Sequence, residues 1–318
     1  MKTSEHEPGA AVTSHYAVSA FTRELIDEIA QNHFSPGSWL TFLSKSWDRS
    51  LEDIRKSPAR TRSTWYWVAV VAAMGAGIIL LALWFESTER ALTALLLWLP
   101  WYTGAVFFLL THLGMVDDNQ GTPHQSLLLP NGLSFLRLAL APLVLWPCLQ
   151  VPVNAVTGPI FVVFLVALSL SDLLDGWLAR RQDLCTRMGR MLDVLADLAL
   201  LTFLSVGLYL AGVIPGPLLL LLIVRYPILL IGVLVLYFVR GPRPLRPTLI
   251  GRATTFATSV VLLTIAFKTL LPISWPTTLW IEWSVWFLYV LIGVNVLYLI
   301  TQGLAWTSRR EDPDSNTG

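Results

Sequence analysis

The stretch that decides the fold is SDLLDGWLARRQDLCTRMGRMLDVLAD, residues 171–197. It carries two aspartate pairs, Asp172/Asp175 and Asp193/Asp197, within a stretch that is otherwise mainly apolar. Their spacings of three and four residues place the two members of each pair on one face of a helix. Carboxylates at membrane depth are costly unless they are neutralised, so they mark a functional site by default. Four acids on two adjacent helices are what a pair of divalent cations needs.

The composition indicates a membrane protein. Of the 318 residues, 54% are hydrophobic and only 14% are charged, whereas a soluble domain carries about 25% charged residues. A membrane-spanning helix needs roughly 20 apolar residues. The sequence predicts an all-α integral membrane protein with about eight spans, at 65–85, 91–113, 133–150, 158–179, 190–213, 217–239, 252–272 and 279–304.

The N-terminal region and the cysteines show what kinds of membrane protein the sequence does not indicate. The first 60 residues are polar and mixed in charge, so we expect the first span to be a membrane anchor and not a cleaved signal peptide. The two cysteines, Cys148 and Cys185, lie in or beside membrane segments. They indicate neither a disulfide framework nor a zinc site.

The positions of Lys and Arg predict the orientation in the membrane. Eight lie before residue 65, four lie at 180–190 and four lie at 240–252, whereas the alternate connections contain only Arg90. Cytoplasmic loops are enriched in Lys and Arg. We therefore expect both termini and the aspartate stretch on the cytoplasmic side, in a bacterial inner membrane.

The chain divides into four predicted parts. Residues 1–64 form a cytosolic helical extension, with helices at about 17–33 and 38–56 separated by SPGS at 35–38. These helices either pack on the chain's own membrane domain or bind a membrane surface or partner. The remaining parts are a transmembrane hairpin with linker, a six-helix catalytic membrane domain and a disordered tail, at 65–130, 131–305 and 306–318.

Written with its spacing, the stretch reads Asp172-x2-Asp175-Gly176-x2-Ala179-Arg180-x8-Gly189-x3-Asp193-x3-Asp197. It resembles the signature of the CDP-alcohol phosphatidyltransferase family at every fixed position. LPNGLSFLR at 129–137 is similar to the start of that family's first core helix, usually PNxITxxR, with Ser134 in place of Thr. The resemblance implies a six-span core over 131–305, with the first 130 residues as an addition.

The resemblance implies transfer of a phosphatidyl group from a CDP-linked lipid to an alcohol, with release of CMP. Two bound cations would stabilise the attacking and leaving oxygens. Mg²⁺ or Mn²⁺ is expected because hard oxygen ligands suit these ions. By the family pattern Asp172, Asp175 and Asp193 are metal ligands. Asp197 is the general base and also contacts metal.

The same pattern implies a nucleotide side of the site. Gly176 and Gly189 would let the nucleotide approach the helix backbone, and Ala179 is small for the same reason. Arg180 would pair with a phosphate of CDP through its planar fork. The resemblance also carries Thr186 and Asn131 as nucleotide-contacting residues.

Other interpretations use similar residues. The aspartates could form membrane salt bridges to four nearby arginines without any metal: Arg180, Arg181, Arg187 and Arg190. Intramembrane prenyltransferases also use two Asp-rich motifs, but on well-separated helices. An inactive relative acting as a membrane scaffold would be expected to have lost an acid, and here all four are present. A transporter would more typically show broken helices and repeated halves.

The part of the predicted site that would bind the acceptor alcohol is less well defined by the sequence. Arg225 lies inside a span, where a lone Arg usually faces a polar cavity, and we take Arg225 and Arg252 as candidate acceptor-binding residues. Arg240, Arg243 and Arg246 could instead meet anionic headgroups. PTLIGRATT at 247–255 is similar to a loop of the family's phosphatidylglycerophosphate and cardiolipin synthases.

That similarity favours glycerol 3-phosphate or phosphatidylglycerol as the acceptor. Val194 and Leu198 stand where those relatives typically have Pro and Lys. Inositol phosphate, serine, or diacylglycerol with a CDP-alcohol therefore stay open as substrates. Membrane lipids and a second copy of the chain, as a homodimer, are the expected partners, and nucleic acid is not.

Overall fold

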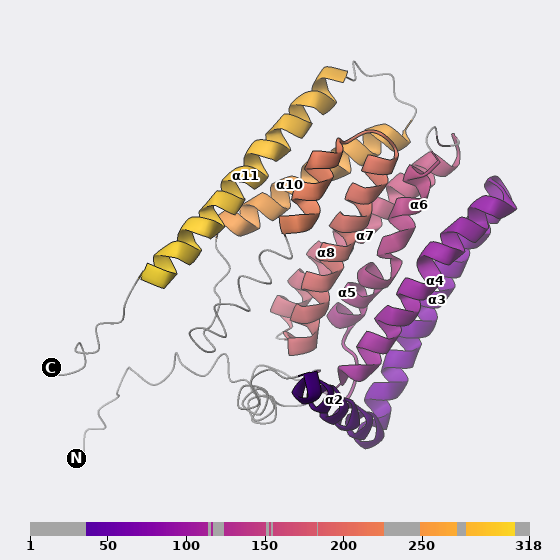
Figure 1. Cartoon of the computed structure of the whole chain (residues 1–318). Coiled ribbons are helices and arrows are strands. Elements are labelled where there is room, and N and C mark those ends of the chain that lie inside the picture. Colours follow the sequence, from indigo (N-terminus) through magenta and orange to yellow (C-terminus); the bar gives the residue numbers. More distant parts are fainter. Residues whose placement is uncertain are drawn as a thin grey trace, which may run out of the picture. The chain divides into compact units, whose positions relative to one another are not determined.

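The computed structural model describes residues 36–113, 116, 124–150, 153, 155–182, 184–225, 249–271 and 278–308. The regular elements of this part are helices (Figure 1). In chain order they are α2 (Pro36–Lys56), α3 (Pro58–Phe85), α4 (Thr88–Thr111), α5 (Leu129–Leu140), the 3₁₀ turn η2 (Ala141–Val144), α6 (Leu145–Cys148), α7 (Thr157–Arg181), α8 (Arg187–Leu210), the short helix Gly216–Arg225, α10 (Leu249–Leu270) and α11 (Thr278–Ser308).

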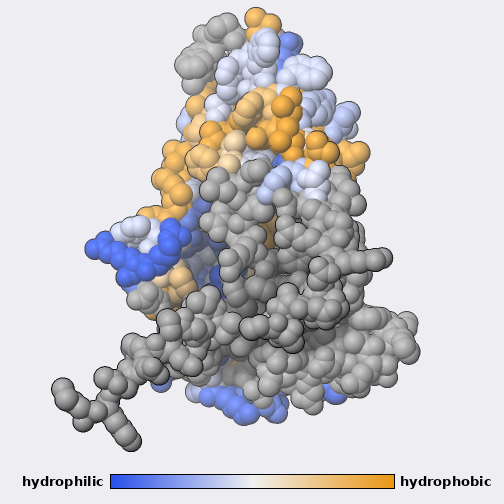
Figure 2. All heavy atoms as spheres, turned by 90° about the vertical axis from the view of Figure 1, so that its left-hand side faces the viewer, coloured by the Kyte–Doolittle hydropathy of each residue, from blue (hydrophilic) through white to orange (hydrophobic). Residues whose placement is uncertain are grey.

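Seven helices in the described ranges are long and apolar enough to cross a membrane, which confirms an all-α, multi-pass membrane protein. On the face shown in Figure 2, many hydrophobic side chains of the described residues are exposed at the surface. The predicted span 217–239 begins as the helix Gly216–Arg225. Its remainder lies outside the described residues.

Two compact units make up the chain. The first contains the described parts of Met1–Leu80, Leu95–Leu140 and Leu168–Asp197, and the second contains those of Leu81–Ala94, Ala141–Ala167 and Leu198–Gly318. Helices α3, α4, α7 and α8 contribute residues to both units. All four aspartates belong to the first unit.

The N-terminal part is helical from Pro36 onward. Helix α2 confirms the predicted helix at 38–56, and the predicted helix at 17–33 lies outside the described residues. Trp47 of α2 stacks on Phe107 of α4, with ring centroids 5.3 Å apart. Helix α3 begins at Pro58, earlier than the expected residue 65, because proline is well suited to the first turn of a helix.

The third predicted span, 133–150, is present as Leu129–Cys148, but it is not a single continuous α-helix. It breaks at η2, which contains Pro142. Proline has no N–H, so the carbonyl of Leu138, four residues earlier, loses its helical donor. The Trp101 indole Nε1 donates to that carbonyl instead, at 2.8 Å. A membrane-embedded carbonyl that the sequence leaves without a helical partner is thereby satisfied from α4.

Candidate metal centre

Helix α5 presents a buried polar face to the aspartates. Asn131, Ser134 and Arg137 follow one another at intervals of three residues and are all buried. This spacing places them on one side of the helix. Apolar residues such as Phe135 and Leu140 surround them, so the polar side chains must find partners on neighbouring helices.

Arg137 is the central cation of the site. Its side chain is 0% exposed, and its two terminal nitrogens contact all four aspartates. Nη1 lies 2.8 Å from Asp172 Oδ1 and 3.5 Å from Asp175 Oδ2. Nη2 donates to Asp193 Oδ1 at 2.6 Å and lies 3.4 Å from Asp197 Oδ1.

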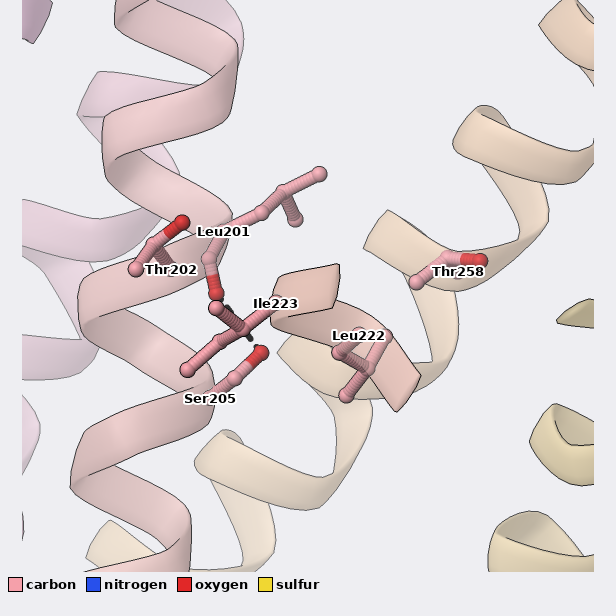
Figure 3. Close-up of a pocket in the computed structure, with 6 residues that line it drawn as sticks. All are labelled: Leu201, Thr202, Ser205, Leu222, Ile223 and Thr258. Carbon is pink, nitrogen blue, oxygen red and sulfur yellow. Dashed lines mark hydrogen bonds between the residues drawn. The ribbon is translucent and has the colours of Figure 1, made fainter. Parts of the chain in front are cut away.

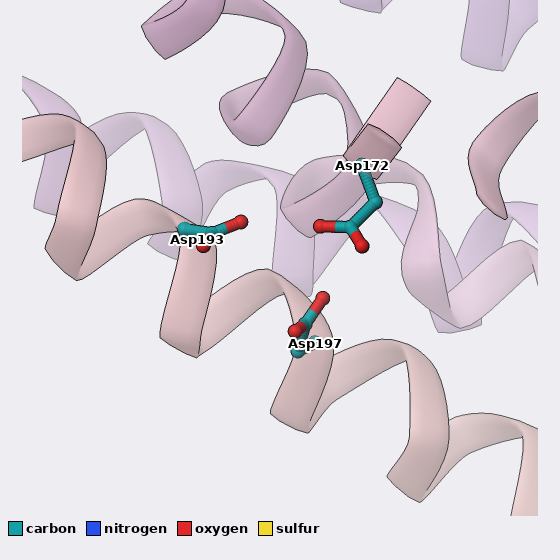
Figure 4. A group of neighbouring side chains, drawn as sticks. All are labelled: Asp172, Asp193 and Asp197. Atoms are coloured by element: carbon teal, nitrogen blue, oxygen red, sulfur yellow. The ribbon is translucent and has the colours of Figure 1, made fainter. Parts of the chain in front are cut away.

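Three of the four carboxylates form an open cluster. Asp172 comes from α7, and Asp193 and Asp197 come from α8. Their carboxylates point toward one another in Figure 4, and each offers an oxygen within 4.8 Å of the others. Their side chains are 41%, 47% and 42% exposed, respectively. A cation could therefore reach them from outside.

Asp175 lies on the inner side of this cluster. Its side chain is only 4% exposed, and its Oδ2 accepts a hydrogen bond from Ser134 Oγ at 2.9 Å. It shares Arg137 with the other three acids but also depends on α5 for a hydroxyl donor. The two members of the first aspartate pair thus have different surroundings.

The donor set fits a divalent cation. Four carboxylates face one guanidinium, which leaves a formal charge of −3 at membrane depth if all four are ionised. Carboxylate oxygens are the ligands that Mg²⁺ and Mn²⁺ prefer. Arg137 contacts one oxygen of each carboxylate at closest approach, and each carboxylate has a second oxygen.

The start of α8 is fixed by hydrogen bonds to α5. Thr186 precedes the helix, and its Oγ1 accepts the N–H of Gly189 at 2.9 Å, as an N-cap does. The same hydroxyl donates to Asn131 Oδ1 at 3.0 Å. A Cβ on Gly189 would stand 2.5 Å from that oxygen. Gly189 therefore has a packing role between α5 and α8, in addition to any contact with nucleotide.

The predicted nucleotide residues of α7 lie on its last turns. Gly176 and Ala179 are partly exposed, and Arg180 is exposed. Arg180 Nη1 lies 3.2 Å from the position that a Cβ on Gly176 would occupy, so its guanidinium folds back over the glycine. The neighbouring Arg181 lies over the Trp177 ring, 4.9 Å from its centroid.

Sequence reasoning did not assign Arg137 to the site. The salt-bridge interpretation named arginines at 180–190 and did not name Arg137 of α5, whose guanidinium contacts the carboxylates. The available signal was the three-residue spacing of Asn131, Ser134 and Arg137 within an apolar span. An Arg inside a membrane span requires partners of opposite charge. The four aspartates, which also lie on predicted membrane helices, were candidates for that role.

The candidate acceptor residues lie in the second unit. Arg225 is 4% exposed, and its Nη2 donates to Thr255 Oγ1 of α10 at 3.0 Å. Arg252 lies on α10, and its side chain is outside the described residues. A small pocket in the same unit is lined by Leu201, Thr202, Ser205, Leu222, Ile223 and Thr258 (Figure 3). Half of these residues carry a hydroxyl group.

Comparison with known proteins identifies the sequence pattern. The profile of the CDP-alcohol phosphatidyltransferase family matches residues 127–297, more than half of the chain. The match includes all four aspartates, Asn131, Ser134 and Arg137. It excludes α2, α3 and α4.

Several curated relatives match parts of the same region. A Mycobacterium tuberculosis protein that carries the provisional name cardiolipin synthase is 32% identical over 181 residues, covering 56% of this chain and 84% of its own length. The Streptomyces coelicolor cardiolipin synthase (CMP-forming) is 35% identical over 142 residues, covering 44% and 66%. The Aquifex aeolicus CDP-diacylglycerol–glycerol-3-phosphate 3-phosphatidyltransferase is 44% identical over 80 residues, covering 25% and 42%. No solved structure gives a significant match.

Proposed function

Because the chain belongs to the CDP-alcohol phosphatidyltransferase family, we propose that it transfers the phosphatidyl group of CDP-diacylglycerol to a glycerol-type alcohol and releases CMP. The observation that carries this proposal is the acidic cluster of α7 and α8, which is open on one side and contacts the buried Arg137 of α5. Enzymes of the family use a divalent metal, and within the described ranges this cluster offers ligands for one.

We assign the metal-binding role to all four aspartates. Asp172, Asp193 and Asp197 already hold their oxygens close together, and Asp175 completes the set from the buried side. When bound, two divalent cations, Mg²⁺ or Mn²⁺, supply positive charge to the phosphate oxygens and the attacking oxygen. Arg137 keeps the four carboxylates together in the absence of metal.

Asp197 is the proposed general base. The acceptor hydroxyl oxygen attacks the phosphorus of the lipid-linked phosphate, and its proton passes to the Asp197 carboxylate. The bond between that phosphorus and the oxygen bridging to CMP breaks, and CMP leaves with the electron pair. A base must lie within hydrogen-bond reach of the hydroxyl. The partly exposed position of Asp197 on α8 allows such an approach.

The nucleotide half of the site is proposed at the ends of α7 and α8. Gly176 and Ala179 have small side chains, so a ligand can approach the helix backbone closely. The exposed Arg180 can turn from Gly176 toward a phosphate of that ligand. Asn131 Nδ2 is buried and has no hydrogen-bond partner among the described residues, which suits a donor reserved for a ligand. Thr186 contributes by fixing Asn131 and stays a predicted nucleotide contact.

Phosphatidylglycerol is the acceptor that we favour, because the Mycobacterium and Streptomyces relatives, matched over 181 and 142 residues, are named as cardiolipin synthases. Glycerol 3-phosphate is the second candidate, supported by the shorter match to the Aquifex enzyme. Arg225 and Arg252 would bind a phosphate of either acceptor. We also propose a homodimer in a bacterial inner membrane, with the acidic site and both termini on the cytoplasmic side.

An acceptor screen tests this function. Purified protein in detergent is given CDP-diacylglycerol, Mn²⁺ or Mg²⁺ and one alcohol at a time, while CMP release and the lipid product are followed. We expect metal-dependent CMP release with phosphatidylglycerol or glycerol 3-phosphate. Serine and inositol phosphate are the comparison acceptors, and CDP-choline with diacylglycerol tests the reversed substrate pair.

The Asp197→Asn variant is the control for the chemistry. The amide cannot accept the proton, so turnover should be lost while most Mn²⁺ binding persists. Near-normal CMP release by this variant would refute the base assignment. A wild-type protein that releases no CMP with any substrate pair would favour the scaffold interpretation.

A further inference from the structure

The hairpin formed by α3 and α4 contacts α5 on the side facing away from the acids. Successive residues of a helix are separated by about 100°, so Gly132 lies almost opposite the polar face of Asn131, Ser134 and Arg137. Helix α5 therefore has the aspartates on one side and the hairpin on the other. The residues of α5, the four aspartates and the hairpin outside Leu81–Ala94 belong to the first compact unit.

The contact at Gly132 leaves no space for a side chain. The position that a Cβ would occupy coincides with the indole ring of Trp67 on α3, far inside van der Waals contact. The indole ring is rigid, so it cannot move aside as the flexible end of a lysine side chain could. The absence of a Cβ at residue 132 thus sets how closely α5 approaches α3.

Further contacts fix the two ends of α5. Before the helix, the Leu127 N–H donates to Ser63 Oγ of α3 at 3.1 Å. Arg60 of α3 donates from Nε to the His124 carbonyl at 2.8 Å and from Nη1 to the Leu113 carbonyl at 2.9 Å. Near the end of the helix, Trp101 of α4 donates to Leu138 O.

We propose that the α3–α4 hairpin is a positioning element of the acidic site, with Trp67 and Trp101 as positioning residues. It presses α5 toward α7 and α8, so that Arg137 and Ser134 meet the carboxylates at their observed distances. The hairpin lies outside the family match. This inference rests on the proposed function only in taking the carboxylates as the metal site.

The test is a pair of complementary substitutions. In Gly132→Ala the new methyl group displaces α5 or Trp67, and Mn²⁺ affinity, measured by electron paramagnetic resonance per folded molecule, should weaken roughly tenfold or more. Turnover should fall with it. In Trp67→Ala/Gly132→Ala the smaller residue makes room, and affinity should return to within roughly threefold of Trp67→Ala alone.

Two glycines of the hairpin serve as matched controls. A Cβ on Gly77 of α3 or Gly104 of α4 meets nothing within 4 Å, so Gly77→Ala and Gly104→Ala should bind Mn²⁺ like the wild type. If Gly132→Ala does not fold, recovery of folding and Mn²⁺ affinity in the double variant still supports the contact.

The proposal is overturned if Gly132→Ala binds Mn²⁺ with wild-type affinity, or if the double variant binds Mn²⁺ more than roughly threefold more weakly than Trp67→Ala alone. A purely structural role would lower the melting temperature of Gly132→Ala and leave the affinity of the folded fraction unchanged. A wild-type protein that neither binds Mn²⁺ nor releases CMP would instead overturn the proposed function. The two failures are therefore distinguishable.

Discussion

Arg137 is a fully buried guanidinium whose four partners come from two other helices. Its planar fork suits this arrangement, because each terminal nitrogen can face two carboxylates at once. A lysine at the same position would offer a single point charge on a flexible stem. The identity of this residue therefore matters as well as its charge.

Replacing Arg137 with Gln should destabilise the metal-free protein more than the metal-loaded one. Removing one partner of a buried ion pair costs about 3–5 kcal/mol. The loss here should be smaller, because three of the carboxylates are more than 40% exposed. Thermal unfolding in detergent, with and without Mn²⁺, measures it. The stabilisation by Mn²⁺ should be larger in Arg137→Gln than in the wild type.

Arg181→Gln is the matched control for that measurement. Arg181 is exposed and lies over the Trp177 ring, so its replacement should change the melting temperature little. Equal Mn²⁺-dependent shifts in Arg137→Gln and the wild type would mean that the guanidinium does not substitute for metal charge.

At the scale of elements, the beginning of α8 depends on one hydroxyl group. Thr186→Val keeps the shape of the side chain but removes the bonds to Gly189 and Asn131. Loss of an N-cap costs about 0.5–2 kcal/mol, so the free energy of unfolding should fall by that amount. Thr186→Ser keeps both bonds and should resemble the wild type. An unchanged melting temperature for Thr186→Val would remove the capping role.

The break in the third span gives a second prediction for an element. Trp101→Phe leaves the Leu138 carbonyl without its indole donor, which should cost about 1–3 kcal/mol for a buried acceptor. Pro142→Ala restores an N–H four residues after Leu138. The cost of Trp101→Phe should therefore be smaller in the Pro142→Ala background, as a double-mutant cycle of unfolding free energies would show. Additive effects would count against this exchange of donors.

At the scale of the whole molecule, the two cysteines report the orientation in the membrane. Cys185 lies between α7 and α8 and is partly exposed, whereas Cys148 is buried. With the acidic site on the cytoplasmic side, a membrane-impermeant maleimide should label Cys185 in inverted vesicles and not in intact spheroplasts. Cys185→Ser should abolish the labelling. Labelling of spheroplasts alone would reverse the proposed orientation.

The sequence alone was enough to predict a multi-pass helical membrane protein and to single out its four aspartates. Long apolar runs must form helices in a membrane, because every backbone polar group needs an internal partner there. The aspartate spacing depends only on helical periodicity, so local sequence was enough to place each pair on one face. The same local argument located α2 to within two residues.

Tertiary structure decided which groups meet across helices. The four ion contacts of Arg137 join residues that are 35 or more positions apart in the sequence. Neither periodicity nor composition specifies such pairs. The break of the third span follows from Pro142, but the donor that satisfies the Leu138 carbonyl is Trp101, 37 residues away. Likewise, a side chain at Gly132 would collide with Trp67, and one at Gly189 would collide with Asn131. Each pair is in contact only in the folded chain. Distances between helices are set by the packing of side chains from distant segments, and this information is not contained in any single stretch of sequence.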